Sequence, residues 1–576
     1  MIEAWHHSFS RTGGWDVRLA DPCEVQSADE LPDVLPLVRR AEAAAREGKW
    51  VTLLLSYESA PAFDAALVTR EPGAFPLAWM AVFEKIRGSG PPPAEGAAPA
   101  PWQPLVSRDE YESAIRRIRE YIAAGDTYQV NYTFPLRAAF PGDGAAWFLR
   151  QGPAQGAPWS VFVDTGRFQV LSFSPELFFE WTADRLVCRP MKGTAQRGLW
   201  FEDDEARRRA LSESRKDRAE NLMITDMVRN DLGRIAEVGS VKTARLFEIE
   251  RYPTLFQMIS EIEARPRPGI RLEDVLRALF PGASVTGAPK VRTMQIIREL
   301  EPQRRGLYTG AVGLLRPGGA AQFSIPIRTV VADRAAGEAV FHAGGGVTWD
   351  STAEGEYDEC LLKTAFLHES PRPFSLLETL RLEDGEYYLL ERHLRRLRQS
   401  AVYFELPVDE SCVRTRLAQL AADHRAGVWR ARLRLDARGE IEIEAQPLIP
   451  DEEPWRVALA DEPVNSRDPF LYHKTTRREI YDRRLAAHPG CRDVILWNER
   501  GEITESCLAN VSAVIGGREY TPPVGCGLLP GTLRGEWLES GRLAERVIRI
   551  EEWRQAEAVH LFNSVRGRIR IEPSHG

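Results

Sequence analysis

Two proline-rich interruptions divide the sequence and limit what it can fold into. The first, GSGPPPAEGAAPAPWQP, runs from Gly88 to Pro104, and the second, HESPRPFS, runs from His368 to Ser375. Neither shows helical or strand periodicity, and prolines interrupt both kinds of element. At roughly 150 residues per domain, a chain of 576 residues is long enough for two large bodies. The expected parts are a first body, residues 1–370 (with an N-terminal portion 1–85, a Pro/Ala loop 86–104 and a main part 105–366), and a second body, residues 371–576.

The charge balance and the cysteines limit the class of protein. Lys and Arg number 75 against 83 Asp and Glu, a net charge of −8, which lacks the basic excess needed to bind nucleic-acid phosphates. Seven cysteines without a CxxC pair fit neither a disulfide framework nor a zinc site. No run approaches the roughly 18 apolar residues of a membrane span, and no signal peptide is recognisable. We therefore expect a soluble, cytoplasmic protein with neither nucleic acid nor membrane as a partner.

Helical and strand patterns alternate irregularly in the first body. Ser107 and Glu110 form an S-x-x-E capping box, and apolar residues recur at helical spacing from there to Gly125. The expected strands are Phe168–Phe173 and Arg185–Arg189, and the expected longer helices are Ala206–Ile235 and Val291–Leu300. This mixture predicts an α+β body.

The second body alternates strands with helices, which predicts an α/β arrangement. The expected strands are Val428–Leu435, Glu440–Ala445, Asp493–Trp497 and Ser512–Ile515, and the expected helices are Glu391–Tyr403, Thr475–Ala487 and Gly531–Glu539.

Two helices of the first body each offer a pair of carboxylates. Asp217 and Glu220 lie three residues apart, and so do Glu356 and Glu359, in a helix that we expect Ser351 to cap. Where two such faces meet in a buried site, a hard cation such as Mg²⁺ relieves their repulsion. A solvated helix face has the same spacing, and spacing alone does not separate the two interpretations.

A glycine triplet and a lysine stand near these helices. AGGGV, Ala343–Val347, follows the expected strand Ala339–His342, and we expect a turn whose N–H groups face an anion. Lys192 follows a strand in RPMKGTAQR. An exposed lysine there is only a surface charge, whereas a desolvated one is a nucleophile or base.

Several ordered motifs between residues 105 and 366 resemble the chorismate-utilising enzyme family. They are YQVNYT (128–133), SFSPELFF (172–179), PMKGT (190–194), AENLMITDMVRNDLGR (219–234), FPGASVTGAPK (280–290), YTGAVG (308–313), FSIPIRT (323–329), and AGGGV followed by EYDE. The resemblance implies antiparallel sheets flanked by helices and a chorismate site that uses Mg²⁺. It implies Glu220 and Glu359 as metal ligands with Asp217 and Glu356 in support, and Thr194, Thr286, Gly287, Arg328, Gly344, Gly345 and Gly346 as substrate-binding residues.

Lys192 is the position that discriminates within this family. Anthranilate synthases tend to carry a small residue there, whereas in aminodeoxychorismate synthases the resemblance implies a lysine that attacks chorismate. That role needs an uncharged amine and therefore a lowered pKa. Where some relatives have a histidine near the metal, this chain has Gln257, which cannot deliver a proton. The group that assists the departing hydroxyl is thus unassigned.

The second body resembles fold-type IV pyridoxal-phosphate enzymes over residues 374–570. The motifs are ETLRLEDGEYYLLERHLRRL (378–397), HKTTRR (473–478), GEITESCLANVS (501–512), LLPGTLR (528–534) and FNSVRG (562–567). The resemblance implies two α/β subdomains, pyridoxal 5'-phosphate as cofactor, and a homodimer formed through this body. It implies Lys474 as the catalytic lysine that binds the cofactor, Glu505 beside the pyridine nitrogen, and Arg396, Gly531, Thr532 and Ser564 around the phosphate.

Together the two resemblances imply two successive reactions. Chorismate and ammonia would give 4-amino-4-deoxychorismate, and loss of pyruvate would then give 4-aminobenzoate for folate synthesis. Because no GxCxGxQ-like elbow occurs, we expect a separate glutamine amidotransferase subunit to supply the ammonia. Two alternatives stay open. One is an isochorismate, salicylate or anthranilate synthase-like body fused to a branched-chain or D-amino-acid aminotransferase-like body. The other is a chain in which one body is inactive and serves for docking.

Overall fold

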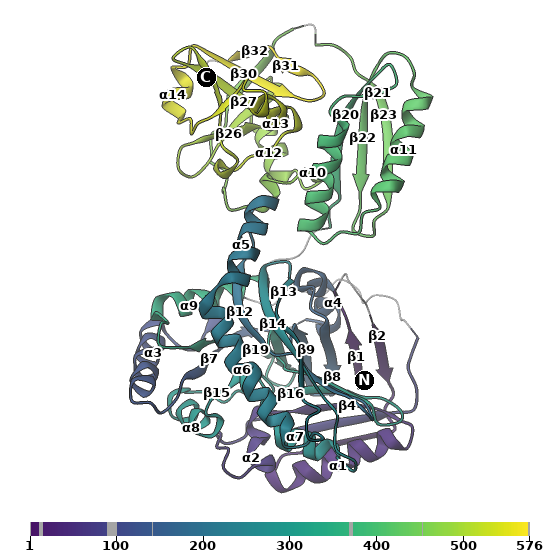
Figure 1. The fold of residues 1–576 in the computed structure, drawn as a ribbon, viewed down its shortest axis with the longest axis vertical. Coiled ribbons are helices and arrows are strands. Elements are labelled where there is room, and N and C mark those ends of the chain that lie inside the picture. The colour runs from purple at the N-terminus through teal and green to yellow at the C-terminus, as the bar shows by residue number, and fades with distance from the viewer. Residues whose placement is uncertain are drawn as a thin grey trace. The chain divides into compact units, whose positions relative to one another are not determined.

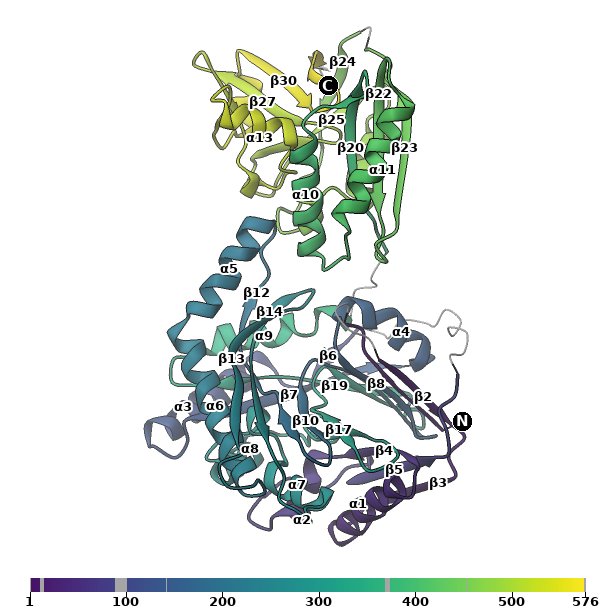
Figure 2. The same ribbon diagram turned by 45° about the vertical axis from the view of Figure 1, so that its right-hand side comes forward.

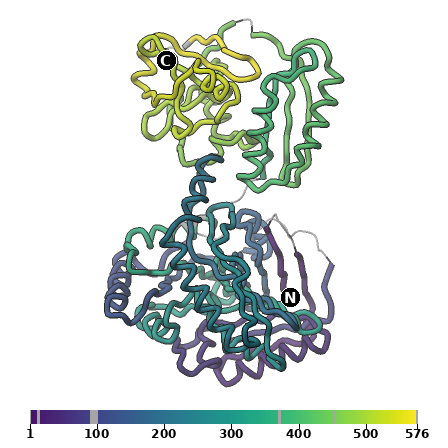
Figure 3. The backbone as a smooth tube through the Cα atoms, in the orientation of Figure 1, coloured from purple at the N-terminus to yellow at the C-terminus, as the bar shows by residue number. Residues whose placement is uncertain are grey.

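The computed structural model describes residues 2–10, 15–88, 101–140, 142–367, 373–451 and 453–573. The chain forms two compact units: Met1–Arg197 with Arg208–Pro371, and Gly198–Arg207 with Arg372–Gly576. The earliest strands (purple) belong to the first unit and the last ones (yellow) to the second (Figure 3). The expected boundary at residues 370 and 371 and most of the Pro/Ala loop lie outside the described residues.

Two antiparallel sheets form the first unit (Figure 1). Within the described residues, one has nine strands in the order β15 (Gly287–Ala288), β7 (Gln129–Ala139), β19 (Glu338–Val347), β18 (Thr329–Asp333), β9 (Phe168–Ser174), β8 (Trp159–Asp164), β1 (Glu3–His7) and β2 (Asp16–Ala20), with β6 (Gln103–Pro104) beside β7. The other has ten, likewise within those residues: β12 (Met191–Gln196), β14 (Leu255–Ala264), β11 (Leu186–Cys188), β10 (Leu177–Trp181), β17 (Ala321–Ser324), β16 (Ala311–Leu315), β4 (Trp50–Leu55), β5 (Ala78–Phe83) and β3 (Glu24–Ala28), with β13 (Lys242–Arg251) beside β14.

Helices cover both sheets, and the sheets share a buried cluster between them. Helices α3 (Arg108–Ala123), α4 (Gly144–Gln155), α8 (Lys290–Leu300) and α9 (Ala353–Leu362) pack on the first sheet, and α1 (Leu31–Arg46), α2 (Ala60–Phe63), α6 (Arg215–Gly233) and α7 (Leu272–Leu279) pack on the second. Val161 and Val170 of the first sheet meet Leu54 and Leu314 of the second in one apolar cluster. The expected antiparallel sheets flanked by helices are thereby confirmed.

Three sheets form the second unit, in the part of the chain that the structure describes. They are β21 (Glu386–Tyr387), β20 (Leu376–Glu383), β22 (Val428–Leu435) and β23 (Ile441–Pro447); β26 (Ile503–Ser506), β25 (Asp493–Trp497), β24 (Trp455–Leu459) and β32 (Ile571–Pro573); and β29 (Ala544–Glu545), β28 (Arg518–Thr521), β27 (Asn510–Ile515), β30 (Ala558–Asn563) and β31 (Gly567–Ile569). Helices α10 (Leu390–Tyr403) and α11 (Glu410–Asp423) pack on one face of the first of these sheets (Figure 2).

The remaining helices are short or lie between strands. They are α5 (Phe201–Glu213), α12 (Glu479–Ala487), α13 (Thr532–Glu539) and α14 (Ile550–Arg554), together with the 3₁₀ turns η1 (Tyr57–Ser59), η2 (Ala283–Val285), η3 (Ala365–Leu367), η4 (Pro469–Leu471) and η5 (Val524–Cys526). No helix within the described ranges combines the length and apolar character that crossing a membrane requires.

Local signals explain where several elements begin. The predicted capping box is confirmed, because Ser107 accepts a hydrogen bond from the Glu110 N–H and the Glu110 carboxylate accepts one from the Ser107 N–H. The single helix expected over Ala206–Ile235 is wrong. The chain breaks at Ser214, whose side chain accepts from the Asp217 N–H and so starts α6.

Two further expectations are corrected at helix starts. Thr352, not Ser351, caps α9, because its hydroxyl accepts from the Gly355 N–H. The helix expected from Thr475 begins only at Glu479, since Thr475 instead forms a β-bridge with Leu376.

The glycine triplet is part of a strand, which corrects the expected turn. Gly344, Gly345 and Gly346 lie in β19 opposite residues 131–133 of β7. A Cβ on Gly344 would lie 2.6 Å from the Tyr132 carbonyl oxygen, so the strands can approach only where the side chain is absent.

Candidate active sites

A cavity of about 410 Å³ lies in the first unit, lined by residues of β12 and β14 from one sheet and of β19 from the other. Ten of the residues singled out in the sequence line it: Lys192, Thr194, Asp217, Glu220, Arg328, Gly344, Gly345, Gly346, Glu356 and Glu359. Thr286 and Gly287 do not. The Thr286 hydroxyl donates to the Gly282 carbonyl oxygen, and a Cβ on Gly287 would lie 2.1 Å from the Gln129 carbonyl oxygen. Both residues are therefore closely packed and lie outside the cavity lining.

Lys192 projects from β12 into this cavity, and its side chain is only 13% exposed. Burial is the main cause that lowers its pKa, and the charge of Lys363 lowers it as well. The nearby carboxylates act in the opposite direction. The closest of these is Glu220, whose Oε2 lies 3.9 Å from the amine. The Lys192 backbone is held by Asn221, whose Nδ2 donates to its carbonyl oxygen over 3.0 Å. The lysine is therefore a positioned, desolvated amine rather than a surface charge.

The four predicted metal ligands come from α6 and α9. Burial raises the pKa of Glu220, against the charge of Lys192, and the charges of Asp217 and Glu356 raise it further. Burial likewise raises the pKa of Glu356, and the charge of Glu359 adds to that rise. These carboxylates thus repel one another inside the cavity.

Each of these carboxylates makes a hydrogen bond or an ion pair with another side chain of the first unit. Glu356 accepts from the Ser351 hydroxyl over 2.6 Å, and Glu359 lies 2.9 Å from the Lys363 amine. Across the described residues, no three Asp, Glu, His or Cys side chains are drawn together as a preformed metal cluster.

Glu176 is a site residue that the sequence reasoning missed. It lines the same cavity, is only 3% exposed, and accepts a 2.6 Å hydrogen bond from the Ser284 hydroxyl. Burial raises its pKa to about 7, so that about half of it is still protonated at pH 7 and nearly all of it one unit lower. The available signal was the one charged residue in SFSPELFF, where β9 ends and β10 begins.

Gln257 and Arg328 also line the cavity, and Gln129 lies next to Gly346 on its wall. Gln257 donates from Nε2 to the Gly193 carbonyl oxygen over 2.8 Å. Gln129 is fully buried, and neither polar atom of its side chain has a hydrogen-bond partner among the described residues. Arg328 adopts a positive φ of 51° and donates from Nη1 to Gln155 over 2.7 Å. Its remaining N–H groups have no hydrogen bond to a described residue, which suits a guanidinium that receives a carboxylate.

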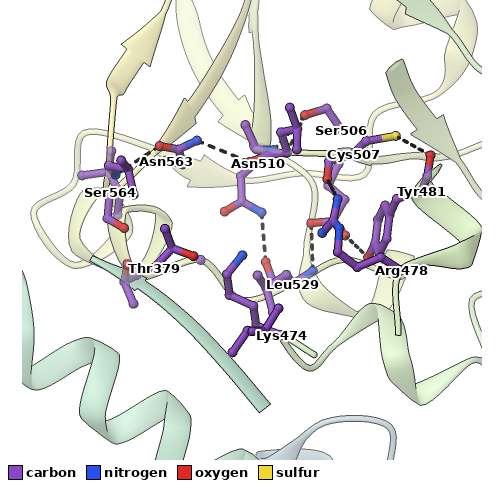
Figure 4. A pocket seen from close by; sticks show the side chains of 18 of the residues that line it. Thr379, Lys474, Arg478, Tyr481, Ser506, Cys507, Asn510, Leu529, Asn563 and Ser564 are labelled. Atoms are coloured by element: carbon purple, nitrogen blue, oxygen red, sulfur yellow. Dashed lines mark hydrogen bonds between the residues drawn. The ribbon is translucent and has the colours of Figure 1, made fainter. Parts of the chain in front are cut away.

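A second cavity of about 450 Å³ lies in the second unit. All six residues predicted for the cofactor line it: Arg396, Lys474, Glu505, Gly531, Thr532 and Ser564. Figure 4 shows the Lys474 side chain pointing into this space, with Thr379 and Ser564 on one side and Arg478 and Tyr481 on the other.

Burial shifts the pKa of Lys474 and the pKa of Glu505 in opposite directions. Burial, together with the charges of Arg396 and Arg478, lowers the pKa of Lys474 to about 8. Burial raises the pKa of Glu505 to about 7, although the Tyr481 hydroxyl donates to it over 2.8 Å. A second donor, the Leu529 N–H, lies 3.1 Å from the other carboxylate oxygen (Figure 4).

Arg396 on α10 faces the start of α13. Its Nε and Nη2 donate to Glu378 over 2.9 and 2.7 Å, and Glu378 also accepts from His393. Burial alone would raise the pKa of Glu378, but Arg396 and His393 together hold it at about 2. Thr532, the first residue of α13, lies 3.2 Å from His393 through its hydroxyl. Gly531 precedes it, and a Cβ there would lie 1.9 Å from Asn510 Oδ1.

Arginines on the wall of the second cavity were not foreseen. Arg430 and Arg432 lie on β22 and line the cavity together with Arg492 and Arg566. Asp451 pairs with Arg492 over 2.6 Å and with Arg566 over 2.8 Å. Arg432, by contrast, makes no ion pair with any carboxylate in the described residues, and so carries charge toward the cavity. Alternating arginines in VWRARLRL were the available signal.

Two protein-family models match this chain. A model of the family "chorismate binding enzyme" matches residues 16–369, and one of "Amino-transferase class IV" matches residues 375–572. Aminodeoxychorismate synthase component 1 of Escherichia coli (strain K12) is 43% identical over 258 residues, 45% of this chain and 56% of that protein. Anthranilate synthase component 1 of Aquifex aeolicus is 37% identical over 267 residues, 46% and 53% of the two chains. The chain spans little more than half the length of these curated relatives.

A solved structure shows the same fold for the first unit. Anthranilate synthase component I from Streptococcus pneumoniae matches with a TM-score of 0.53 and 23% sequence identity, over 63% of this chain and 90% of that one. The family model covers more than half of the sequence. The chain therefore belongs to the chorismate binding enzyme family, and its C-terminal part carries an amino-transferase class IV domain.

Proposed function

We propose that the first unit converts chorismate and ammonia to 4-amino-4-deoxychorismate, and that the second unit releases pyruvate from this product to give 4-aminobenzoate. The observation that carries the proposal is that each cavity contains a lysine whose pKa is lowered by burial, Lys192 in the first and Lys474 in the second, whereas, despite burial, the pKa of Lys363 in the first cavity is raised by Glu359. A lysine amine is a nucleophile or a base only when it is neutral. Relatives named aminodeoxychorismate synthase component 1, in Escherichia coli and in Bacillus subtilis, support the first step.

In the first unit, Lys192 supplies the nucleophile and Glu176 the proton. The lysine nitrogen loses a proton and forms a bond to C2 of chorismate, while both ring double bonds shift by one position and the C4–O bond breaks. The proton of Glu176 goes to the departing oxygen, which leaves as water. Ammonia then forms a bond to C4 and gives up a proton, and the lysine nitrogen leaves C2 and takes up a proton as both double bonds return. Glu176 suits this role because its pKa of about 7 leaves a substantial protonated fraction near neutrality.

Mg²⁺ fits the carboxylates of the same cavity. Glu220 and Glu359 would hold the ion, with Asp217 and Glu356 in support. The charges of Asp217 and Glu356 raise the pKa of Glu220, and the charge of Glu359 raises that of Glu356, and this repulsion favours a divalent cation. The bound ion would neutralise a carboxylate of chorismate. Arg328 would take the other carboxylate through its remaining N–H groups.

Pyridoxal 5'-phosphate fits the second cavity. Lys474 would hold the cofactor covalently, Glu505 would face the pyridine nitrogen, and Arg396 with the start of α13 would hold the phosphate. The raised pKa of Glu505 supports this placement, because a neighbouring cation would compensate its buried charge. When bound, the cofactor supplies an electron sink for loss of the C4 proton.

The chain's own residues move that proton and bind the substrate. Lys474 accepts the C4 proton in its neutral form. Its pKa is lowered to about 8, so the neutral form predominates above that pH. The substrate carries two carboxylates, and the charge of Arg432, with Arg430 on the same face of β22, suits them. Protonation of the enolpyruvyl methylene and loss of pyruvate then leave an aromatic ring.

Two single variants of the full chain test the proposal. With chorismate, ammonium, Mg²⁺ and pyridoxal 5'-phosphate, Lys192→Ala should form neither the aminated intermediate nor 4-aminobenzoate. Lys474→Ala should accumulate 4-amino-4-deoxychorismate. The exposed Lys242→Ala on β13 is the control and should behave as the wild type. Normal 4-aminobenzoate formation by either active-site variant would remove that lysine from its role.

We further propose that a glutamine amidotransferase subunit supplies the ammonia, since the sequence lacks a glutaminase-like motif. The purified chain should use ammonium but not glutamine. Glutamine-dependent turnover without a partner would contradict this.

A further inference from the structure

Ten residues from within the sequence of the first unit belong to the second unit. This inserted segment, Gly198–Arg207, lies more than 160 residues before the rest of the second unit. Its start is fixed by its own acidic residues, since the Gly198 N–H donates to Asp204 and the Leu199 N–H donates to Asp203, each over 2.9 Å. A Cβ on Gly198 would lie 2.2 Å from the Asp204 nitrogen, so this tight start requires glycine.

The inserted segment packs beside the turn that carries Lys474. The Trp200 ring stacks on Tyr472, with centroids 5.3 Å apart and an angle of 26° between the planes. Leu199 and Trp200 both contact the buried apolar cluster of Leu471 and Tyr472. Tyr472 is two residues before Lys474, so the stacking fixes the backbone that leads into the cofactor lysine.

A second contact approaches the same turn from α10. The Tyr403 hydroxyl donates to the Gly198 carbonyl oxygen over 2.8 Å, and the Tyr403 ring lies 4.2 Å from the ring of His473. His473 in turn lies 2.9 Å from the Ser400 hydroxyl through Nδ1. Tyr472 therefore contacts Trp200 of the inserted segment. His473 contacts Tyr403, which is itself hydrogen-bonded to that segment.

We propose that Trp200 is a positioning residue for Lys474: its ring holds the Tyr472–His473 turn so that the lysine amine stays buried and directed into the second cavity. This inference rests on the proposed role of Lys474 as the lysine that binds pyridoxal 5'-phosphate. It assigns a function in the second unit to a residue that lies between the motifs of the first unit. Figure 4 shows the direction of the lysine that this turn sets.

The test uses the full chain stripped of cofactor. The visible absorbance that appears when pyridoxal 5'-phosphate binds Lys474 is followed from pH 6 to pH 10 in the wild type, Trp200→Ala, Trp200→Phe and Trp349→Ala. Trp349, 55% exposed, is the matched control in the first unit. Trp200→Ala should capture the cofactor at least about tenfold more weakly, and its pH midpoint should move upward by about half a unit or more as water reaches the amine. Trp200→Phe, which keeps a stacking ring, should restore both.

The controls separate the two proposals. If the wild type itself fails to bind pyridoxal 5'-phosphate through Lys474, the proposed function of the second unit fails. If the wild type binds and Trp200→Ala keeps its affinity and midpoint, the positioning role is overturned. Should Trp200→Ala not fold, Tyr403→Phe replaces it, because this variant removes the hydroxyl that donates to Gly198 and keeps the ring beside His473. An upward shift in its midpoint then supports the role, and an unchanged midpoint overturns it.

Discussion

Gly346 leaves open the space that the amine of Lys192 occupies. A Cβ at Gly346 would lie 2.1 Å from Lys192 Nζ, far inside any real contact. Gly346→Ala should therefore displace the amine and lower the rate of chorismate amination by about 10²-fold, as misplacement by about 1 Å does in other active sites. The rate with ammonium, measured as loss of chorismate, checks this.

Gly233→Ala is the matched control for this change. Gly233 is the last residue of α6 and has nothing within 4 Å of a Cβ, so amination should be unchanged. A wild-type rate in Gly346→Ala would show that Lys192 does not act from the place where the structure puts it.

Glu176 should impose a pH dependence on the first reaction. Its pKa is about 7, so the proton needed for the departing hydroxyl is lost as the pH rises through 7, and kcat should fall there. Glu176→Gln should lower kcat by about 10²- to 10⁴-fold and remove this limb of the profile. Ser284→Ala removes a hydrogen bond that stabilises the carboxylate, and should move the limb to higher pH. Retention of the limb in Glu176→Gln would assign it to another group.

The same group should affect stability with a definite sign. The folded pKa of Glu176 is raised above its ordinary value of 4.5, so its contribution to folding is complete below pH 4.5 and is lost as the pH rises to about 7. Between pH 5 and pH 8, the melting temperature of Glu176→Gln should fall less than that of the wild type. Equal falls in calorimetry would count against a buried, protonated Glu176.

Lys474 should govern how the second unit takes up its cofactor. With a pKa of about 8, its amine is neutral above that pH, and the rate of pyridoxal 5'-phosphate capture should rise with a midpoint near pH 8. Stopped-flow absorbance measures this rate. Lys474→Ala should give no covalent absorbance band. A midpoint near the ordinary lysine value of 10.5 would contradict a desolvated amine.

Arg432 should contribute to substrate affinity in the second unit. Removing a charge-assisted contact is worth about 10- to 100-fold in affinity, so Arg432→Ala should raise KM for 4-amino-4-deoxychorismate by that factor with little change in kcat. Arg434→Ala is the control on the same strand face, because Arg434 pairs with Glu442 over 3.3 Å and does not line the cavity. Equal KM values for the two variants would remove Arg432 from substrate recognition.

Local signals predicted much of the secondary structure, because they depend on neighbours in sequence. Ser107 and Glu110 start α3 by bonding to each other's backbone, and no distant residue is needed. The strand around Arg432 was likewise predicted, because alternation is a local pattern. The break at Ser214 was missed, since a serine inside a long polar helical pattern resembles any other polar residue until its side chain is seen to cap α6.

Features that depend on distant contacts could not be predicted in this way. The triplet Gly344–Gly346 looks like a turn, but its glycines are required because β7 and Lys192 approach β19 closely. Glu176 resembles a stray charge in a strand until Ser284, more than 100 residues later, is placed beside it. Trp200 belongs to the second unit only through its contact with Tyr472.

The identity of the aromatic product tests the central claim most directly. The purified chain is incubated with chorismate, ¹⁵N-ammonium, Mg²⁺ and pyridoxal 5'-phosphate, and the products are identified by mass spectrometry. The account predicts ¹⁵N-labelled 4-aminobenzoate with one pyruvate for each molecule formed. Labelled anthranilate, or unlabelled isochorismate or salicylate, in place of 4-aminobenzoate would contradict it.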